Sequence, residues 1–141
     1  MKVSILVLLL LVFSNVMICQ EYERVKEDQY VFTFFINSKV PKGILKVFLD
    51  TTDNQSLIIR MEYKRRGEDS IIQEIELGHT TEYFDEHSIE ITDENHDGYN
   101  DITILYNQGN HESDYDVWLY NPKTNKYDYS EEFGNLKSFR N

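Results

Sequence analysis

A chain of 141 residues with a formal net charge of −11 is long enough for one domain. Its acidity argues against nucleic acid as a partner, because phosphates require a basic face. The same charge suits cations or a basic protein partner, although it also serves simply to keep a protein soluble. The only cysteine is Cys19, so the folded domain has no internal disulfide and depends on its core, on a bound ligand, or on both.

The first 20 residues have the order of a secretory signal peptide. Lys2 supplies the positive charge, and the apolar run 4–13 is too short to span a bilayer, which takes about 20 apolar residues. Cleavage after Cys19 or Gln20 would release a secreted or periplasmic protein without a membrane span. A lipid anchor on Cys19 is the disfavoured alternative, because Ile18 is larger than the residue that normally precedes a lipidated cysteine. We therefore predict a signal peptide over 1–20 and one folded domain over 21–141. Removing 1–20, whose only charged residue is Lys2, lowers the net charge by one, to −12.

Short β-rich runs recur along the rest of the chain, and none shows a sustained helical period. The expected strands are, in chain order, 30–36, 44–49, 57–63, 71–77, 88–92, 102–106, 115–120 and 127–129. Pro122 and two asparagines in 121–126 predict a hairpin turn. The polar tail 131–141 is compatible with a short helix or with a frayed end. The pattern predicts an all-β fold: a single small antiparallel domain of about seven or eight strands, built as a meander or sandwich or as a partial barrel.

Residues 93–101 have the pattern Asp-x-Asn-x-Asp-Gly-x-x-Asp, which is typical of a calcium loop. Calcium takes six to eight oxygen ligands, and alternate side chains of a curled backbone can supply them. Gly98 would allow the sharp turn, since glycine adopts left-handed backbone angles at little cost. The expected ligands are the side chains of Asp93, Asn95, Asp97 and Asp101 and the backbone carbonyl of Tyr99. The alternative is an ordinary hairpin turn, which these residue types also favour.

The flanks of this loop are predicted strands and not helices. The twelfth position, where an EF-hand carries a bidentate glutamate, is Ile104. The loop therefore joins strand to strand, as in FG-GAP-type calcium loops. Without metal the crowded carboxylates repel one another, so we expect Ca²⁺ to stabilise the fold.

The loop and the segment after it resemble a family of secreted bacterial proteins. The residues that carry the resemblance are 91–103, Val117-Trp118-Leu119-Tyr120-Asn121-Pro122-Lys123-Thr124 and 126–132. In that family a calcium loop precedes a W-L-Y-N-P-x-T hairpin, and some members are periplasmic immunity proteins, calcium-dependent inhibitors of lysozyme-like effectors. The matched stretch, 88–132, is about a third of the chain, and the N-terminal half has no match.

The resemblance implies a β-rich, non-enzymatic protein of the bacterial envelope that binds Ca²⁺ through the loop ligands given above. Its partner would be a basic protein such as a peptidoglycan hydrolase, which electrostatic attraction to an acidic inhibitor favours. The segment 107–115 would face that partner, and Tyr99 and Tyr115 are the candidate contact residues. Packing within the sheet is the alternative for both tyrosines.

Two other functions remain open. One is a structural or adhesive surface module that binds glycan or another protein and that calcium only rigidifies. The weaker one is a hydrolase that uses acidic side chains, although clusters of acids arise by chance in a chain with 25 acidic residues. The four histidines form no closely spaced metal-binding pair, and no sequence context suggests a catalytic nucleophile, so we predict that the protein is not an enzyme.

Overall fold

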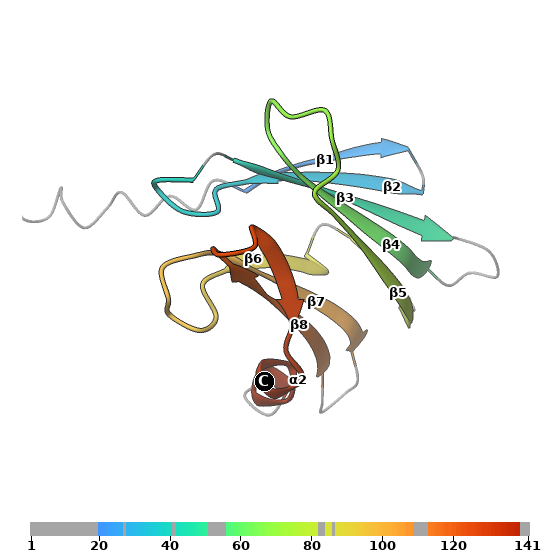
Figure 1. Cartoon of the computed structure of the whole chain (residues 1–141). Coiled ribbons are helices and arrows are strands. Elements are labelled where there is room, and N and C mark those ends of the chain that lie inside the picture. The colour runs from blue at the N-terminus through green and yellow to red at the C-terminus, as the bar shows by residue number, and fades with distance from the viewer. Residues whose placement is uncertain are drawn as a thin grey trace, which may run out of the picture.

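The computed structural model describes residues 20–26, 28–40, 42–50, 56–81, 84–85, 87–108 and 113–138. They form two antiparallel sheets that lie face to face, with one helix outside them (Figure 1). The prediction of a small all-β antiparallel domain is confirmed, in the form of a sandwich. The predicted signal peptide, apart from Gln20, lies outside the described residues, and so does Cys19.

The first sheet is a five-stranded meander in which each strand pairs with the next. Its strands are β1 (Glu21–Lys26), β2 (Gln29–Phe34), β3 (Gly43–Asp50), β4 (Ser56–Arg65) and β5 (Gln73–Thr81). Buried and half-buried residues alternate strictly along β2 and β3, because successive side chains of a strand point to opposite faces of the sheet. Strand β1 was not predicted, because all six of its residues are exposed and it has no alternation.

The second sheet is a four-stranded meander that carries the candidate calcium loop. Its strands are β6 (Ile89–Thr92), β7 (Asp101–Gln108), β8 (Ser113–Asn121) and β9 (Lys126–Tyr129), and helix α2 (Glu131–Ser138) follows. The described residues therefore form nine strands, one more than the upper expectation. The polar tail contains the short helix that was one of its two expected conformations.

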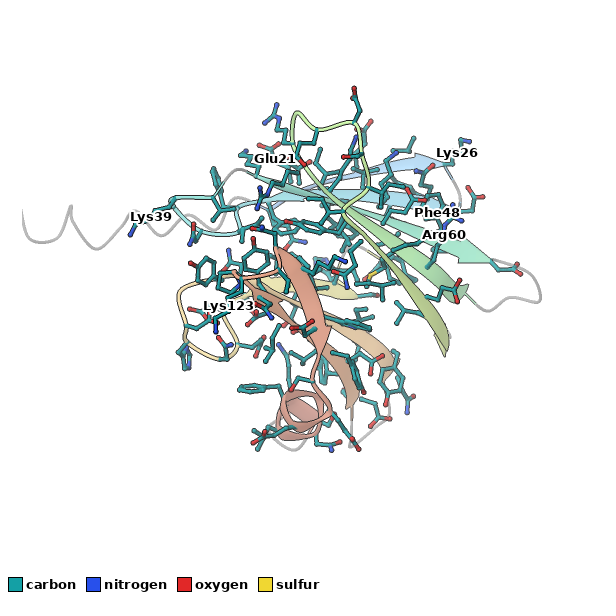
Figure 2. The ribbon with its side chains drawn as sticks, viewed as in Figure 1. Glu21, Lys26, Lys39, Phe48, Arg60 and Lys123 are labelled. Atoms are coloured by element: carbon teal, nitrogen blue, oxygen red, sulfur yellow. The ribbon has the colours of Figure 1, made fainter. Side chains whose placement is uncertain are left out.

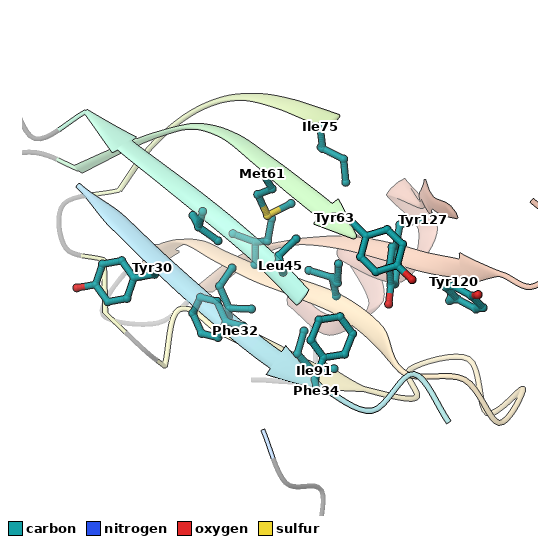
Figure 3. Close-up of a cluster of buried hydrophobic side chains, with 14 of the residues drawn as sticks. Tyr30, Phe32, Phe34, Leu45, Met61, Tyr63, Ile75, Ile91, Tyr120 and Tyr127 are labelled. Atoms are coloured by element: carbon teal, nitrogen blue, oxygen red, sulfur yellow. The ribbon is translucent and has the colours of Figure 1, made fainter. Parts of the chain in front are cut away.

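The core lies between the two sheets (Figure 3). Phe32 and Leu45 of the first sheet and Ile91 of the second are at most 1 % exposed. Tyr63 and Tyr127 close one side with an edge-to-face contact whose ring centroids are 5.0 Å apart. Since a fully buried large apolar side chain contributes about 1.5–3 kcal/mol, this interface is the main source of stability. It fixes the positions of β6 and β7, the two strands that hold the loop.

Helix α2 forms a third layer on the outer face of the second sheet. Val117 and its register partner Thr103 point away from the core, yet neither is exposed, because α2 packs across β8 on this side. A Cβ on Gly134 would lie 2.6 Å from the carbonyl oxygen of Tyr115, so only glycine allows this close approach. The middle of the helix is thereby held against the sheet.

The outer face of the first sheet is solvated and charged. The guanidinium of Arg60 lies 4.4 Å from the ring centroid of Phe48 and pairs with Glu62 and Glu74 (Figure 2). Such exposed pairs add little to stability and keep this face soluble. Within the described residues, no helix is both long and apolar enough to cross a bilayer.

Candidate metal centre

The loop 93–100 is anchored at both ends. Thr92 at the end of β6 pairs with Asp101 at the start of β7, so the sheet itself fixes where the loop leaves and returns. The loop is also attached to the segment after β2. The backbone N–H of Asn100 donates to the carbonyl of Ile36 at 2.7 Å, and its side-chain amide donates to the carbonyl of Phe35 at 2.7 Å. The loop therefore bridges the two sheets.

Inside the loop, side-chain oxygens turn inward and accept hydrogen bonds from the backbone. The N–H of Asp97 donates to Asp93 Oδ1 and to Asn95 Oδ1, both at 3.0 Å. The N–H of Gly98 donates to Asp93 Oδ2 at 2.8 Å, and the N–H of Tyr99 donates to Asp97 Oδ1 at 2.9 Å. The structure thus brings three predicted ligands, at positions one, three and five, around one bend.

The backbone of the bend takes two left-handed residues. Gly98 has φ 91°, as the sequence predicts for the position after the third ligand, and His96 has φ 60°. Glycine adopts this region without steric cost, whereas a residue with a Cβ does so less readily. His96 is exposed, and its side chain is not among the predicted ligands.

Asp101 lies beneath the loop and not at its tip. It is fully buried, and its carboxylate accepts hydrogen bonds from the N–H of Glu94 at 2.9 Å and the N–H of Tyr120 at 2.8 Å. Burial, together with the nearby charge of Asp97, raises the pKa of Asp101 to about 6 against the lowering effect of these hydrogen bonds. A nearby cation would favour the ionised form of this carboxyl.

The donor set determines which ion could fit. Among the described residues, no three carboxylate, histidine or cysteine side chains gather closely enough to hold a metal by themselves. An ion here needs the amide oxygen of Asn95 and a backbone carbonyl beside the carboxylates. Asn95 Nδ2 donates a hydrogen bond to Asp97 Oδ2 at 3.0 Å, so the two side chains that would share one calcium shell already lie side by side. An oxygen that already accepts one N–H keeps a lone pair for a cation, so these hydrogen bonds do not exclude a metal.

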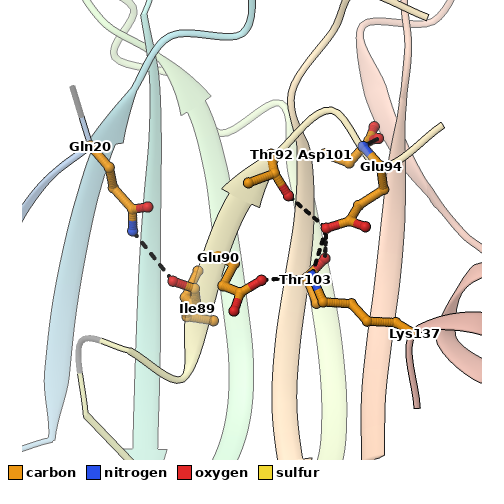
Figure 4. A network of polar contacts seen from close by, with 8 residues as sticks. All are labelled: Gln20, Ile89, Glu90, Thr92, Glu94, Asp101, Thr103 and Lys137. Carbon is orange, nitrogen blue, oxygen red and sulfur yellow. Dashed lines mark hydrogen bonds and ion pairs between the residues drawn. The ribbon is translucent and has the colours of Figure 1, made fainter. Parts of the chain in front are cut away.

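Glu94 has a role that the sequence did not reveal. Its Oε1 accepts hydrogen bonds from the hydroxyl of Thr92 at 2.6 Å, from the hydroxyl of Thr103 at 3.3 Å and from the ammonium of Lys137 at 2.6 Å (Figure 4). Lys137 also lies 2.6 Å from Glu90. Burial alone would raise the pKa of Glu94, but the bonds from Lys137 and the hydroxyls outweigh it and hold the pKa below its usual value. Glu94 therefore points out of the loop and connects it to α2.

The two candidate partner-contact tyrosines pack within the protein. The ring of Tyr99 lies 5.3 Å from that of Tyr120. The backbone N–H of Tyr115 donates to Ser138 Oγ, and the ammonium of Lys137 lies 5.5 Å from its ring centroid. Both tyrosines are half-buried, as the packing alternative expects. The middle of the predicted partner-facing segment, 109–112, lies outside the described residues.

Comparison with known proteins adds no relative. No protein-family model, curated protein or solved structure matches the chain.

Proposed function

We propose that the protein is a secreted or periplasmic, non-enzymatic calcium-binding protein. It binds one Ca²⁺ in the loop 93–101 and inhibits a basic peptidoglycan hydrolase of the lysozyme type, as an immunity protein does. The observation that carries the metal assignment is the inward turn of the oxygens of Asp93, Asn95 and Asp97 in a loop that joins two paired strands. The backbone carbonyl of Tyr99 and the carboxylate of Asp101 would complete the protein's share of the shell.

The chemistry of the donors favours calcium over other common ions. All proposed ligands are hard oxygens, whereas zinc in proteins is held mainly by cysteine and histidine. Mg²⁺ demands a near-octahedral shell and keeps several waters, so a flexible loop of protein oxygens suits the larger ion better. The positive charge of Ca²⁺ would also offset the repulsion between Asp97 and the buried Asp101.

The anchors of the loop explain how binding could stabilise the whole domain. The loop is bonded to the segment after β2 through Asn100 and to α2 through Glu94. An ion that orders the loop therefore favours the arrangement of both sheets and the helix. At a Ca²⁺ concentration 100 times the Kd, linkage gives about 2.7 kcal/mol.

The inhibitor role is supported by charge and by the resemblance of 88–132 to the immunity proteins. The formal net charge of −11 favours fast association with a basic enzyme, especially at low salt. Tyr99 and Tyr115 remain the proposed contact residues, since Tyr99 belongs to the loop, Tyr115 contacts Lys137, which is bonded to Glu94, and both tyrosines are only half-buried.

The metal assignment is tested by melting the protein in Ca²⁺ and in chelator. We expect Ca²⁺ to raise the Tm by roughly 10 °C, from the linkage energy and the usual entropy of unfolding of a domain this size. Asp97→Ala should abolish the shift, whereas Asp69→Ala, an exposed aspartate in the β4–β5 turn, should keep it. A melt and near-UV spectrum that are unchanged by chelation would refute calcium binding.

The inhibitor role needs a separate assay. Purified basic lysozyme-type hydrolases are mixed with the protein in Ca²⁺, and the clearing of a peptidoglycan suspension is followed. We expect at least one enzyme to be inhibited at a stoichiometric ratio and released from inhibition by Asp97→Ala but not by Asp69→Ala. Binding to glycan without inhibition of any enzyme would instead favour the surface-module alternative.

A further inference from the structure

Strand β6 leaves one edge of the second sheet open. It pairs only with β7 among the described strands. The carbonyl of Ser88 accepts a hydrogen bond from the N–H of Leu105 in β7. By register, the backbone N–H and C=O groups of Glu90, two residues further along, also face β7. In an antiparallel ladder the alternate residues point the other way, so the N–H and C=O groups of Ile89 and Ile91 face outward. An edge of this kind is a template for another strand.

Strand β1 extends over this open edge. Tyr22 and Arg24 pair with Phe32 and Tyr30, whose side chains lie in the core, so Tyr22 and Arg24 are on the core-facing side of the first sheet. Tyr22 is nevertheless 50 % exposed. The reason is that, among the described strands, the first sheet has one more than the second, so none of them lies opposite β1 in the second sheet.

A cavity of about 350 Å³ lies between this overhang and the β6 edge. It is lined by Gln20, Tyr22, His87, Ile89, Glu90, Ile91 and Thr92. Among the described residues, one side chain reaches the outward backbone groups: the amide of Gln20 donates to the carbonyl of Ile89 at 3.4 Å (Figure 4). That distance is at the long limit for a hydrogen bond, so the contact does little to close the edge.

The opposite edge of the same sheet is closed in a different way. The side-chain amide of Gln73 donates to the carbonyl of Tyr127 at 2.8 Å and accepts from its N–H at 2.7 Å. Gln73 thus supplies to β9 the pair of hydrogen bonds that a neighbouring strand would supply. No described residue makes such a pair of bonds with Ile89 or Ile91.

We propose that the groove between β1 and β6 accepts an extended, basic segment of a partner protein as an added antiparallel strand of the second sheet. Its backbone would pair with Ile89 and Ile91. Its side chains would alternate between an apolar set beneath Tyr22 and a cationic set near Glu90, which pairs with Lys137 and still has a side chain that is 49 % exposed. The choice of a basic protein as the partner rests on the proposed function.

The charge of the protein selects among possible occupants. A second copy would bring another net charge of −11 to the same edge, so self-pairing is opposed by repulsion. A basic segment is attracted by the same field. The partner that fits is therefore a cationic protein with an exposed extended segment or edge strand, and a dimer of this chain would contradict the proposal.

The test uses the full chain in Ca²⁺ and a defined peptide probe, acetyl-Lys-Val-Lys-Val-Lys-Val-Lys-amide. Amide hydrogen exchange is followed by NMR. Saturating peptide should slow exchange at Ile89 and Ile91 at least about tenfold, the change expected when an edge amide gains a strand partner. The peptide N-methylated at its valines and the peptide with glutamate in place of lysine should both fail to do so. Unchanged exchange at Ile89 and Ile91, or equal protection by the N-methylated probe, would overturn the proposal.

Two tyrosines on opposite edges provide a matched control. Tyr22 in β1 is 50 % exposed and Tyr129 in β9 is 52 % exposed. Tyr22→Ala should weaken peptide binding about tenfold, as the loss of an aromatic anchor does, and Tyr129→Ala should leave it unchanged. The calcium-dependent melt is measured on the same samples. Peptide protection without a calcium shift would reject only the proposed calcium site, and a calcium shift without protection would reject only the groove.

Discussion

The ammonium nitrogen of Lys137 lies 2.6 Å from Glu94 Oε1, so the last turn of α2 is bonded to the second residue of the candidate calcium loop. The backbone N–H of the same glutamate is bonded to the buried carboxylate of Asp101. Glu94 is therefore held on one side by the helix and on the other by the base of the loop. The conformation of the loop and the position of α2 depend on each other.

Lys137→Met should lower the free energy of unfolding by about 1.5–3 kcal/mol, the usual contribution of hydrogen bonds to charged groups. The reason is that Glu90 and Glu94 lose the cation that compensates them, while methionine keeps the apolar length of the side chain. Urea unfolding measures the change. Lys123→Met, in the exposed β8–β9 turn, is the control and should change stability by less than about 0.5 kcal/mol. Equal losses in the two variants would mean that the contact with Glu94 contributes nothing specific.

Alanine substitutions at two glycines should separate an effect on stability from an effect on calcium binding. Gly98 in the loop has φ 91° and Gly67 in the β4–β5 turn has φ 90°, and a Cβ on either would meet no atom within 4 Å. Each substitution by alanine should cost on the order of 1 kcal/mol without metal, because only the left-handed backbone is penalised. We expect Gly98→Ala alone to weaken Ca²⁺ binding, measured by titration calorimetry. A similar loss of affinity in Gly67→Ala would contradict the assignment of the loop.

The sequence predicts those parts of the structure that depend on neighbouring residues. Strand β4 is an example, since Met61 and Tyr63 alternate with Arg60 and Glu62, and both Met61 and Tyr63 are buried. The bend of the loop is another, because the hydrogen bonds among Asp93, Asn95 and Asp97 span only a few residues and follow from their spacing.

The parts that could not be predicted depend on contacts distant in sequence. Strand β1 has no apolar face, because it projects beyond the second sheet, so its six exposed residues gave no period-2 signal. The bond between Glu94 and Lys137 joins residues 43 positions apart, and nothing local selects this lysine. The same holds for the hydrogen bond from the side chain of Gln73 to the carbonyl of Tyr127, 54 positions away. Register and layer order decide these contacts.

The tyrosines of the core predict a loss of stability at alkaline pH. Burial raises the pKa of Tyr63 to about 12, and burial also raises the pKa of Tyr127 well above its ordinary value. In the unfolded chain both ionise near pH 10, so folding keeps protons that the unfolded state releases. The stability is complete below pH 10 and falls between pH 10 and about 12, by about 3 kcal/mol for Tyr63. Unfolding in urea across this range measures the fall. Tyr63→Phe should reduce the slope, and an unchanged slope in that variant would assign the loss to other groups.

Asp101 and Asp97 should differ in what they contribute without calcium. Asp101 is fully buried and accepts the N–H groups of Glu94 and Tyr120, so Asp101→Ala leaves two donors without their acceptor. An unsatisfied buried donor costs roughly 1–3 kcal/mol, and the relief from burying a charged carboxyl offsets only part of that cost. We expect Asp101→Ala to lower the Tm clearly in chelator.

Asp97→Ala removes an exposed carboxylate, so it should change the Tm in chelator much less and should instead abolish the increase that Ca²⁺ produces. Melts of the two variants with and without Ca²⁺ therefore separate the buried residue that supports the loop from the exposed residue whose main role is to bind the ion. If Asp97→Ala unfolded the metal-free protein as strongly as Asp101→Ala, the bend would be a structural turn and the calcium assignment would lose its basis.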